Sequence, residues 1–432
     1  FSINRVSKRM RRVHFTDPVL RESNSGQLLQ FINCRVLLEG RLRDEHLWIR
    51  DGKIVDADII FYVERASADI QIDCGGLVLS PGFIDIQING GFGVDFSTFP
   101  GDAGVYMKGV EMVSRRLLQY GVTAYAPTLI TSAPETYKAV LPLLPPKKGG
   151  PHGATTLGVH IEGPFICKAK KGAHPEHLVR YTFLQNPAES LDEVYGDLSN
   201  VALVTLAPEL AGALEAIRLF RSRSIVVSLG HSSANLRQGA AAVAAGAKCI
   251  THLFNAMQVY HHREPGVIGL LAEEEESDGR GFRSLNVAYG IIADGVHVHD
   301  SALRIAHRTA PQGLILVTDA IAALGMGDGI HDLGAQKVCV HGRRATVQGT
   351  ETAAGSVADM PFCIRYLMNA TRCSLDDALL CATAKPAEVI GVSPRKGQLR
   401  IGSDADLVLL SEDVDVKATF INGSLVFVSE ER

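Results

Sequence analysis

The sequence IVVSLGHSSANLRQGAAAVAAGAKCITHL, residues 225–253, decides the fold. It starts with a short apolar run that ends at His231, continues through a helical pattern at Ser233–Ala245, and reaches a second apolar run, Lys248–Leu253, that contains His252. Strand–helix–strand alternation of this kind is typical of a parallel sheet, because two parallel neighbours need a crossover connection. The stretch therefore predicts one unit of an α/β fold with a histidine near the end of each strand.

The same alternation continues in both directions, over about Ser80–Ser393. Other helical patterns lie at Ala103–Tyr120, Leu210–Ser222 and Ser301–Thr309. Eight apolar runs have the length of strands, namely Leu77–Ile88, Val122–Leu129, Thr156–Glu162, Val201–Ala207, Ile225–His231, Lys248–Leu253, Val287–Ile292 and Leu314–Asp319. Eight strands favour a closed (β/α)8 TIM barrel over an open doubly wound sheet.

The two ends of the chain differ from this middle part. Short β-like runs separated by turn residues occupy Leu28–Leu79 and return at Gly397–Leu410 and Ala418–Val428. They predict an antiparallel sheet in the first of these segments, and one small domain built from both ends of the chain. The expected division is a small β domain of residues 26–79 and 397–432 and a catalytic barrel of residues 80–396.

The segment from Phe1 to Arg12 contains five basic residues and no acidic one. This composition resembles that of an organelle transit peptide, but the segment is short and poorly amphipathic. We therefore expect residues 1–25 to form a disordered basic tail.

Composition excludes several classes of protein. The formal net charge is -4, from 43 basic and 47 acidic residues, so nothing in the charge favours nucleic acid or a membrane surface as a partner. No apolar run has the roughly 18 residues of a membrane-spanning helix. The eight cysteines are scattered without a CxxC pair, which is typical of reduced thiols in a cytoplasmic enzyme.

Ionisable residues stand at the ends of four predicted strands. Strand three ends at Glu162, strand five at His231, strand six near His252 and strand eight at Asp319. The carboxyl ends of barrel strands form the catalytic face, so these side chains should converge. One carboxylate and two imidazoles with an open position suit one catalytic divalent metal ion, and zinc fits best, although Fe²⁺, Co²⁺ and Mn²⁺ accept the same ligands.

Two further residues near these strand ends allow more than one interpretation. Asp319 could be a fourth ligand, a helix cap or a proton carrier, and its position opposite a metal-activated water favours the last. His160 lies two residues before Glu162 on the same face of strand three, and therefore deeper in the barrel. We interpret His160 as a supporting or core residue.

Five motifs occur in order along the chain: Pro81-Gly82-Phe83-Ile84-Asp85, His160-Ile161-Glu162-Gly163-Pro164, Gly230-His231-Ser232, Thr251-His252-Leu253-Phe254-Asn255-Ala256-Met257 and Thr318-Asp319-Ala320. These motifs and their order are typical of the amidohydrolase superfamily, which the chain resembles from about Leu28 to Val428. Within the superfamily, the resemblance is closest to deacetylases of phosphorylated amino sugars. It implies a barrel with a small β-sandwich, and hydrolysis of N-acetylglucosamine 6-phosphate to glucosamine 6-phosphate and acetate in amino-sugar catabolism.

The resemblance also implies roles for individual residues. Metal ligands carry over to Glu162, His231 and His252, and the acid/base to Asp319; a homodimer is implied as well. Substrate contacts carry over to Ala173, His174, Asn255, Ala256, Arg263, Asp294, Gly295, Val296, His297, Ala353, Ala354 and Gly355. Arg263 offers a guanidinium fork for the phosphate, and the loop around His174 could close over the sugar.

Strand one departs from the wider superfamily. It usually supplies a His-x-His pair for a second metal ion, whereas this chain has Gln87-Ile88-Asn89. Neutral amides are poor ligands for a transition metal, so we expect a single metal ion per chain. The alternative, that Gln87 and Asn89 only pack the mouth of the barrel, predicts the same stoichiometry.

Other functions remain to be separated from this one. The nearest is an amidohydrolase acting on a cyclic amide or a nucleobase, since members of the superfamily share the barrel and differ in their loops. A barrel that has lost its chemistry is another, but it would have no reason to retain three ligands and Asp319. The acidic run Glu273–Glu276 is expected to be a solvated loop without function, in preference to a calcium site.

Overall fold

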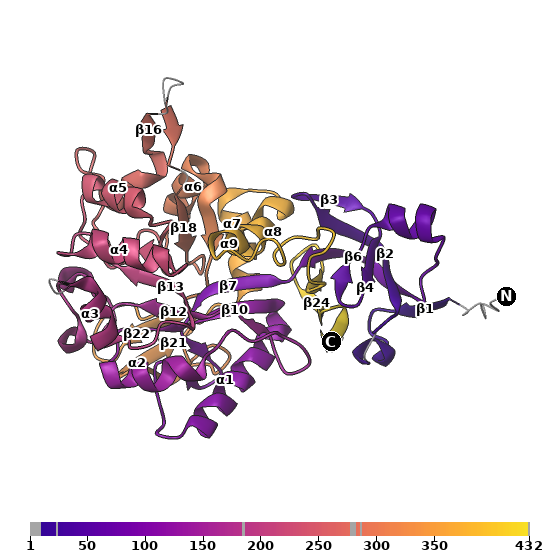
Figure 1. Cartoon of the computed structure of the whole chain (residues 1–432), viewed down its shortest axis with the longest axis horizontal. Helices are drawn as coiled ribbons and strands as arrows, with labels where there is room; N and C mark the ends of the chain where they lie inside the picture. Colours follow the sequence, from indigo (N-terminus) through magenta and orange to yellow (C-terminus); the bar gives the residue numbers. More distant parts are fainter. Residues whose placement is uncertain (1–9, 23–24, 184–185, 277–281, 286, 431–432) are drawn as a thin grey trace.

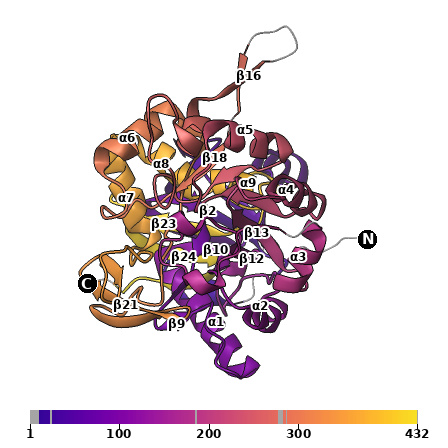
Figure 2. The same ribbon diagram turned by 90° about the vertical axis from the view of Figure 1, so that its left-hand side faces the viewer.

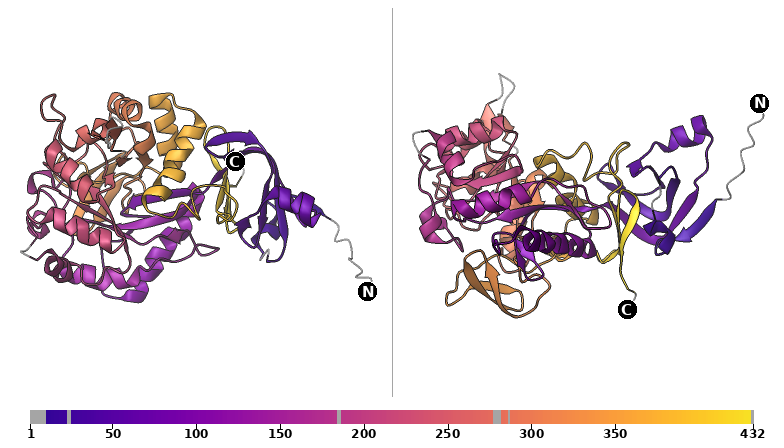
Figure 3. Two further views of the ribbon diagram at one scale, coloured as in Figure 1. Left: turned by 45° about the horizontal axis from the view of Figure 1, so that its top comes forward. Right: turned by 60° about the horizontal axis from the view of Figure 1, so that its bottom comes forward.

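The computed structural model describes residues 10–22, 25–183, 186–276, 282–285 and 287–430. A barrel of parallel strands forms the larger part of the molecule, and a nine-stranded sheet lies at the end that carries both termini (Figure 1). Both views in Figure 3 show this sheet beside the barrel and outside its ring of helices.

All eight predicted barrel strands are present, and all are parallel. They are β7 (Phe83–Ile88), β10 (Val122–Leu129), β12 (Val159–Glu162), β13 (Val201–Leu206), β14 (Val226–Leu229), β15 (Cys249–Ile250), β18 (Ala288–Ile291) and β19 (Leu314–Leu316). A short strand, β11 (Thr155–Thr156), also pairs with β10. Backbone hydrogen bonds from Asp319 N to Gln87 O (2.8 Å) and from Asn89 N to Ala320 O (2.7 Å) join the end of β19 to β7. The predicted (β/α)8 barrel is confirmed.

Helices surround the barrel strands, as Figure 2 shows. They are α1 (Ala103–Leu117), α2 (Pro134–Val140), α3 (Pro187–Val194), α4 (Ala213–Ser222), α5 (Leu236–Ala245), α6 (Asp300–Thr309), α7 (Met360–Thr371), α8 (Leu375–Ala382) and α9 (Ala384–Val389). Helix α5 begins where the sequence provides a capping box of Asn235 and Gln238, which satisfies free N–H groups of the first turn. Its buried face consists of Gly239, Ala242 and Ala245, whose small size lets the helix pack closely.

The nine-stranded sheet combines both ends of the chain. Its strands are β1 (Arg11–His14), β2 (Leu28–Leu38), β3 (Arg41–Asp44), β4 (Leu47–Arg50), β5 (Lys53–Ile54), β6 (Ile70–Pro81), β23 (Leu407–Leu410), β24 (Val416–Ile421) and β25 (Ser424–Val428). The predicted antiparallel arrangement is wrong for β2, which pairs with β6 in parallel. The sheet has its own buried core, which includes Phe31, Ile72 and Phe420. The proposed division into domains at residues 79 and 397 stays a prediction.

The expected disordered tail is wrong for part of residues 1–25. Residues Arg11–His14 form β1, which pairs in parallel with β6, and Val13 is buried in the core of the sheet. Asp17 then caps a short helical turn by accepting a hydrogen bond from Val19 N. Residues 1–9 and 23–24 lie outside the described residues.

A three-stranded sheet that the sequence analysis did not predict follows the last barrel strand. It consists of β20 (Gly329–Leu333), β21 (Gln336–His341) and β22 (Arg344–Val347), with β21 labelled at the lower left of Figure 2. The chain leaves the barrel after Asp319 and returns to the same residue, because Ser356 N donates to Asp319 O at 2.9 Å and Ile321 N donates to Ser356 O at 3.0 Å.

The acidic run forms part of a hairpin, so the predicted loop is wrong for its backbone. Strand β16 (Glu274–Glu276) pairs with β17 (Phe282–Ser284), and β16 projects from the barrel in Figure 1. Among the described residues, no helix is long and apolar enough to cross a membrane.

Candidate metal centre and active site

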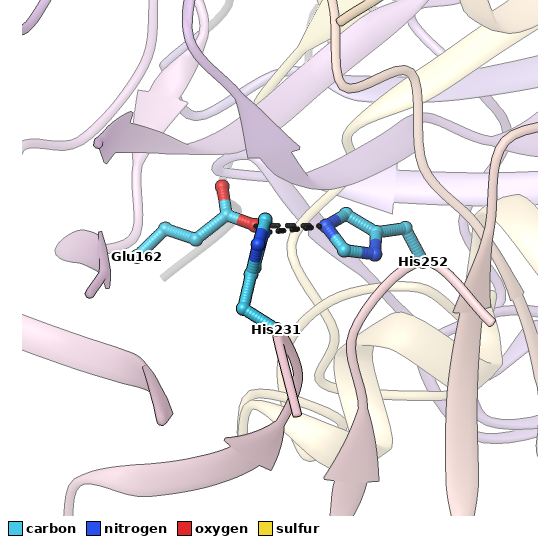
Figure 4. Close-up of side chains that lie close together, drawn as sticks. All are labelled: Glu162, His231 and His252. Atoms are coloured by element: carbon cyan, nitrogen blue, oxygen red, sulfur yellow. Dashed lines mark hydrogen bonds and ion pairs between the residues drawn. The ribbon is translucent and has the colours of Figure 1, made fainter. Parts of the chain in front are cut away.

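Three predicted ligands meet at the mouth of the barrel. Glu162 is the last residue of β12, while His231 and His252 each follow the end of a strand by two residues. The Nε2 atoms of His231 and His252 both lie 3.0 Å from Glu162 Oε1, and 3.0 Å from each other. Figure 4 shows the three buried side chains pointing toward one another.

The donor set fits a divalent cation. The Nδ1 atom of His231 lies 2.8 Å from Lys170 O and must donate to it, so Nε2 is the ring nitrogen that faces the cluster and can serve as the ligand. Burial opposes a charge on Glu162, but the two imidazoles hold the pKa of this carboxyl well below its usual range. A carboxylate oxygen and imidazole nitrogens so close together are the arrangement that a bound cation stabilises.

The backbone at these positions is strained. His231 (φ 50°), His252 (φ 29°) and Asp319 (φ 49°) all adopt the left-handed region that favours glycine. Each such residue costs on the order of 1 kcal/mol or more, and is held only where its surroundings enforce it. Strain at three of the four predicted functional residues indicates that the fold aims their side chains at the mouth of the barrel.

Asp319 lies beside the cluster and is held by amide groups. Asn89 Nδ2 donates to Asp319 Oδ1 at 2.7 Å, and Gln87 Nε2 lies 3.3 Å from the same oxygen and 3.2 Å from Glu162 Oε1. Burial, together with the negative charge of Glu162, raises the pKa of Asp319 to about 6. Gln87 and Asn89 are therefore donors to the two carboxylates, a role that the sequence analysis did not predict.

His160 is not one of the converging groups. Its Nε2 lies 2.8 Å from Thr205 Oγ1 and its Nδ1 3.3 Å from Thr128 Oγ1, and burial lowers its pKa to about 4. The ring is therefore a neutral, hydrogen-bonded part of the core, in agreement with its expected position deeper in strand three.

A cavity of ≈ 230 Å³ opens onto Glu162, His231, His252 and Asp319. Seven of the residues predicted to contact substrate line it: Ala173, His174, Asn255, Ala256, His297, Ala353 and Gly355. The cavity is also lined by residues that were not predicted as substrate contacts, namely Gly172, Ile130, Ile292, Leu333 and Thr352. Three of these are apolar, and apolar character alone does not separate a cavity wall from a core.

Two histidines of the cavity have fixed orientations. Thr131 N donates to His174 Nδ1 at 3.2 Å, so the proton of the neutral ring is on Nε2. His297 Nδ1 lies 2.7 Å from Asp294 Oδ2, and Asp294 Oδ1 also accepts hydrogen bonds from the backbone N–H groups of Val296 and His297. Asp294 thus orients His297, and does not itself line the cavity.

The remaining predicted contacts lie outside the cavity lining. They are Arg263, Asp294, Gly295, Val296 and Ala354. Arg263 is exposed, in a loop where Val259 (74%) and Tyr260 (58%) are exposed too. The structure does not bring its guanidinium into the cavity, so the phosphate contact stays a prediction.

Comparison with known families agrees with the fold. The profile of the amidohydrolase family matches residues 78–426. The chain belongs to the amidohydrolase family. Members of this family typically use a divalent metal, and the buried Glu162, His231 and His252 form a group whose ligand atoms lie close enough to hold one.

Individual amidohydrolases resemble the chain over nearly its whole length. The N-acetylglucosamine-6-phosphate deacetylase of Caenorhabditis elegans is 54% identical over 407 residues, which cover 94% of this chain and 96% of that protein. The crystal structure of the deacetylase from Pasteurella multocida has a TM-score of 0.78 at 28% identity, covering 92% of this chain and 99% of that one. A variant of the Mycobacterium smegmatis deacetylase, in complex with N-acetyl-D-glucosamine-6-phosphate, has a TM-score of 0.76 at 31% identity, covering 93% and 99%.

Proposed function

We propose that this chain hydrolyses N-acetyl-D-glucosamine 6-phosphate to D-glucosamine 6-phosphate and acetate. The observation that carries the proposal is the buried set of Glu162, His231 and His252 beside Asp319, at a cavity in a chain 54% identical to a deacetylase of this substrate. The cavity, ≈ 230 Å³ in volume, suits a small molecule.

Glu162, His231 and His252 would hold one metal ion, which we propose to be Zn²⁺, although Fe²⁺, Co²⁺ and Mn²⁺ accept the same ligands. When bound, such an ion supplies Lewis-acid activation of water and of the amide carbonyl. Gln87 and Asn89 donate to neighbouring carboxylates through their side-chain nitrogens, and their neutral amide oxygens are poor ligands for a transition-metal ion. One ion per chain is therefore expected.

Asp319 carries the proton through the reaction. As a carboxylate it accepts the proton of the attacking water, and as the acid it delivers that proton to the amine nitrogen when the C–N bond breaks. A pKa of about 6, which a bound cation lowers further, keeps Asp319 ionised near neutral pH, as acceptance of the proton requires. Asn89 and Gln87 hold the accepting oxygen in place.

Polar groups around the cavity orient the sugar. The Nε2–H of His174 can donate to the acetamide oxygen as negative charge develops on it. His297, whose Nδ1 lies against Asp294, offers Nε2 as an acceptor to a sugar hydroxyl. Arg263 lies outside the cavity lining, where it could bind a phosphate that stays partly solvated.

We further propose a homodimer in the cytoplasm. All eight cysteines are free, which suits a reducing compartment. The likeness to the deacetylases is the support for the dimer, and gel filtration with light scattering would test it.

Acetate release tests the activity. Purified enzyme should produce acetate and free amine in equal amounts from N-acetylglucosamine 6-phosphate, and should lose this activity after treatment with a chelator. A cyclic amide and a nucleobase serve as controls for the rival function. Hydrolysis of either control without acetate release from the phosphosugar would overturn the proposal, and two tightly held ions per chain in elemental analysis would overturn the single-metal site.

A further inference from the structure

Asp85 is a buried carboxylate to which the proposed reaction gives no role. It lies in β7, is fully buried (0% exposed), and ends the motif Pro81-Gly82-Phe83-Ile84-Asp85. Its Oδ2 accepts a hydrogen bond from Thr318 Oγ1 at 2.5 Å. Its Oδ1 lies 3.3 Å from Gln87 N and 3.4 Å from Thr318 N, which both donate to it. The carboxylate therefore joins the first barrel strand to the end of the last one.

No lysine or arginine within the described ranges forms an ion pair with Asp85, and burial raises its pKa to about 7. A buried carboxyl group without a cationic partner costs free energy unless hydrogen bonds compensate it. Three donors converge on Asp85, and all three belong to Gln87 or Thr318. These two residues have in common that each is linked directly to Asp319.

The links to Asp319 run through backbone and side chain. Thr318 precedes Asp319, and its Oγ1 accepts a hydrogen bond from Ala320 N at 3.2 Å. This bond connects the residues on either side of Asp319, whose backbone is strained. Gln87 O accepts from Asp319 N at 2.8 Å, while the Gln87 side-chain amide reaches Asp319 Oδ1. Asp85 is therefore hydrogen-bonded to both Gln87 and Thr318, the two residues that hold Asp319 in its left-handed backbone conformation.

We propose that Asp85 is a positioning residue for Asp319, which it holds through Thr318 and Gln87 in the orientation needed for proton transfer. This inference rests on the proposed acid/base role of Asp319. Asp85 touches neither the cavity nor the ligand cluster, so its effect should be on turnover and not on substrate or metal binding.

An aspartate suits this place better than an asparagine does. A carboxylate offers only acceptors, which match the three donors. With asparagine, one acceptor becomes an NH₂ group that faces the hydroxyl of Thr318, so the hydroxyl must turn its proton elsewhere. A misplacement of about 1 Å can cost about 10²-fold in rate.

The test starts with Asp85→Asn. The variant should lose about 10- to 100-fold in kcat, with KM within about twofold and metal content unchanged. Asp406→Asn is the matched control, because Asp406 is also a buried carboxylate (5% exposed) but lies far from the barrel mouth in the chain, directly before β23 of the nine-stranded sheet. It should lower the melting temperature without lowering kcat per folded molecule.

Substitutions of Thr318 test the same link if Asp85→Asn fails to fold. Thr318→Val removes the hydroxyl at nearly constant volume and should lower kcat as Asp85→Asn does. Thr318→Ser keeps the hydroxyl and should retain most of the activity. Equal activity of the Val and Ser variants would overturn the proposal.

A double substitution separates this inference from the proposed function. In an Asp319→Asn background, Asp85→Asn should cause no further loss of kcat, because it acts only through Asp319. If Asp85→Asn lowers kcat equally in both backgrounds, or in neither, the positioning role fails while the role of Asp319 stands. If Asp319→Asn alone is fully active, the proposed acid/base function fails, and the positioning role fails with it.

Discussion

Carboxylates beside the nine-stranded sheet and carboxylates at the mouth of the barrel have different partners. Directly before β23 of the nine-stranded sheet, Lys396 Nζ lies 2.5 Å from Oδ2 of the buried Asp406 and 3.1 Å from Oδ2 of the half-buried Asp404. At the mouth of the barrel, Glu162 and Asp319 are buried beside histidines and amides, and the described residues provide no lysine or arginine partner for them. A lysine therefore neutralises charge in the first group, whereas the second group has no such cation among the described residues.

The pKa directions express this difference. Burial alone would raise the pKa of Asp404, but Lys53 and Lys396 hold it below its ordinary value. Burial raises the pKa of Asp319 to about 6, with no lysine to oppose it. Carboxylates that are paired with lysines connect segments of the chain. Carboxylates without such a partner are free to bind a cation or to take up a proton. Substitutions in the group paired with lysines are therefore expected to lower stability, and substitutions at the mouth of the barrel to lower turnover.

The largest effect is expected at the barrel mouth, for Asp319→Asn. Loss of the proton carrier should lower kcat by about 10²–10⁴-fold, the usual contribution of general acid–base catalysis. Metal content, measured by elemental analysis, should remain one ion per chain. Near-normal turnover would show that this uncompensated carboxylate is not used in the chemistry.

The next effect is expected in the nine-stranded sheet, for Lys396→Met. Removing the cation leaves the buried carboxylate of Asp406 without a cationic partner, which should lower the free energy of unfolding by about 3–5 kcal/mol. The side chain of Lys53 is 44% exposed, and Lys53→Met, the matched control, should cost at most about 1 kcal/mol. Urea unfolding measures the free energy of unfolding of both variants. A lower kcat per folded Lys396→Met molecule would contradict the expectation that this group affects stability alone.

Sequence reasoning succeeded for the fold and for the convergence at the barrel mouth. Glu162, His231 and His252 follow apolar runs, so local pattern and barrel geometry together predict that they meet. It failed for β1, since one buried residue, Val13, is too weak a signal for pairing with a strand nearly sixty positions away. It also missed β20–β22, whose strands are short and partly polar, and whose packing against Ile130 and Ile321 no local pattern reveals.

Substrate recognition was harder to predict than the metal site for a related reason. The proposed ligands lie at strand ends of the barrel, whereas Arg263 lies in an exposed loop outside any strand or helix. Its chemistry suits phosphate, and the structure nevertheless leaves it outside the cavity lining. Likewise, the amide contacts of Gln87 and Asn89 depend on how β7 and β19 close the barrel.

A smaller effect is expected for Arg263→Ala. If Arg263 binds the phosphate, KM for N-acetylglucosamine 6-phosphate should rise about tenfold or more, in line with a charged hydrogen bond. KM for unphosphorylated N-acetylglucosamine should not change. Arg308→Ala, at another exposed arginine on α6, is the control. Equal changes for both sugars would exclude a phosphate contact.

The smallest effect is the dependence of kcat on pH near neutrality. Asp319 must be ionised to accept a proton, so kcat should fall as the pH drops through its pKa, by twofold at the pKa itself. That pKa is about 6 without a bound cation, and a cation lowers it further, so the fall should lie at or below pH 6. The residual activity of Asp319→Asn should not show this fall; a persisting fall would assign it to another group.

The chain between Ala320 and Ser356 begins and ends at Asp319. It carries Leu333, Thr352 and Ala353 to the cavity, and the Gln336 side chain donates to the backbone oxygen of Ala173. Because this segment returns to the residue at which it left the barrel, its length and sequence can change without displacing the strand end that holds Asp319, the proposed proton carrier. Over evolutionary time, selectivity for the sugar can thus diverge in this segment while the bond-breaking chemistry is inherited intact.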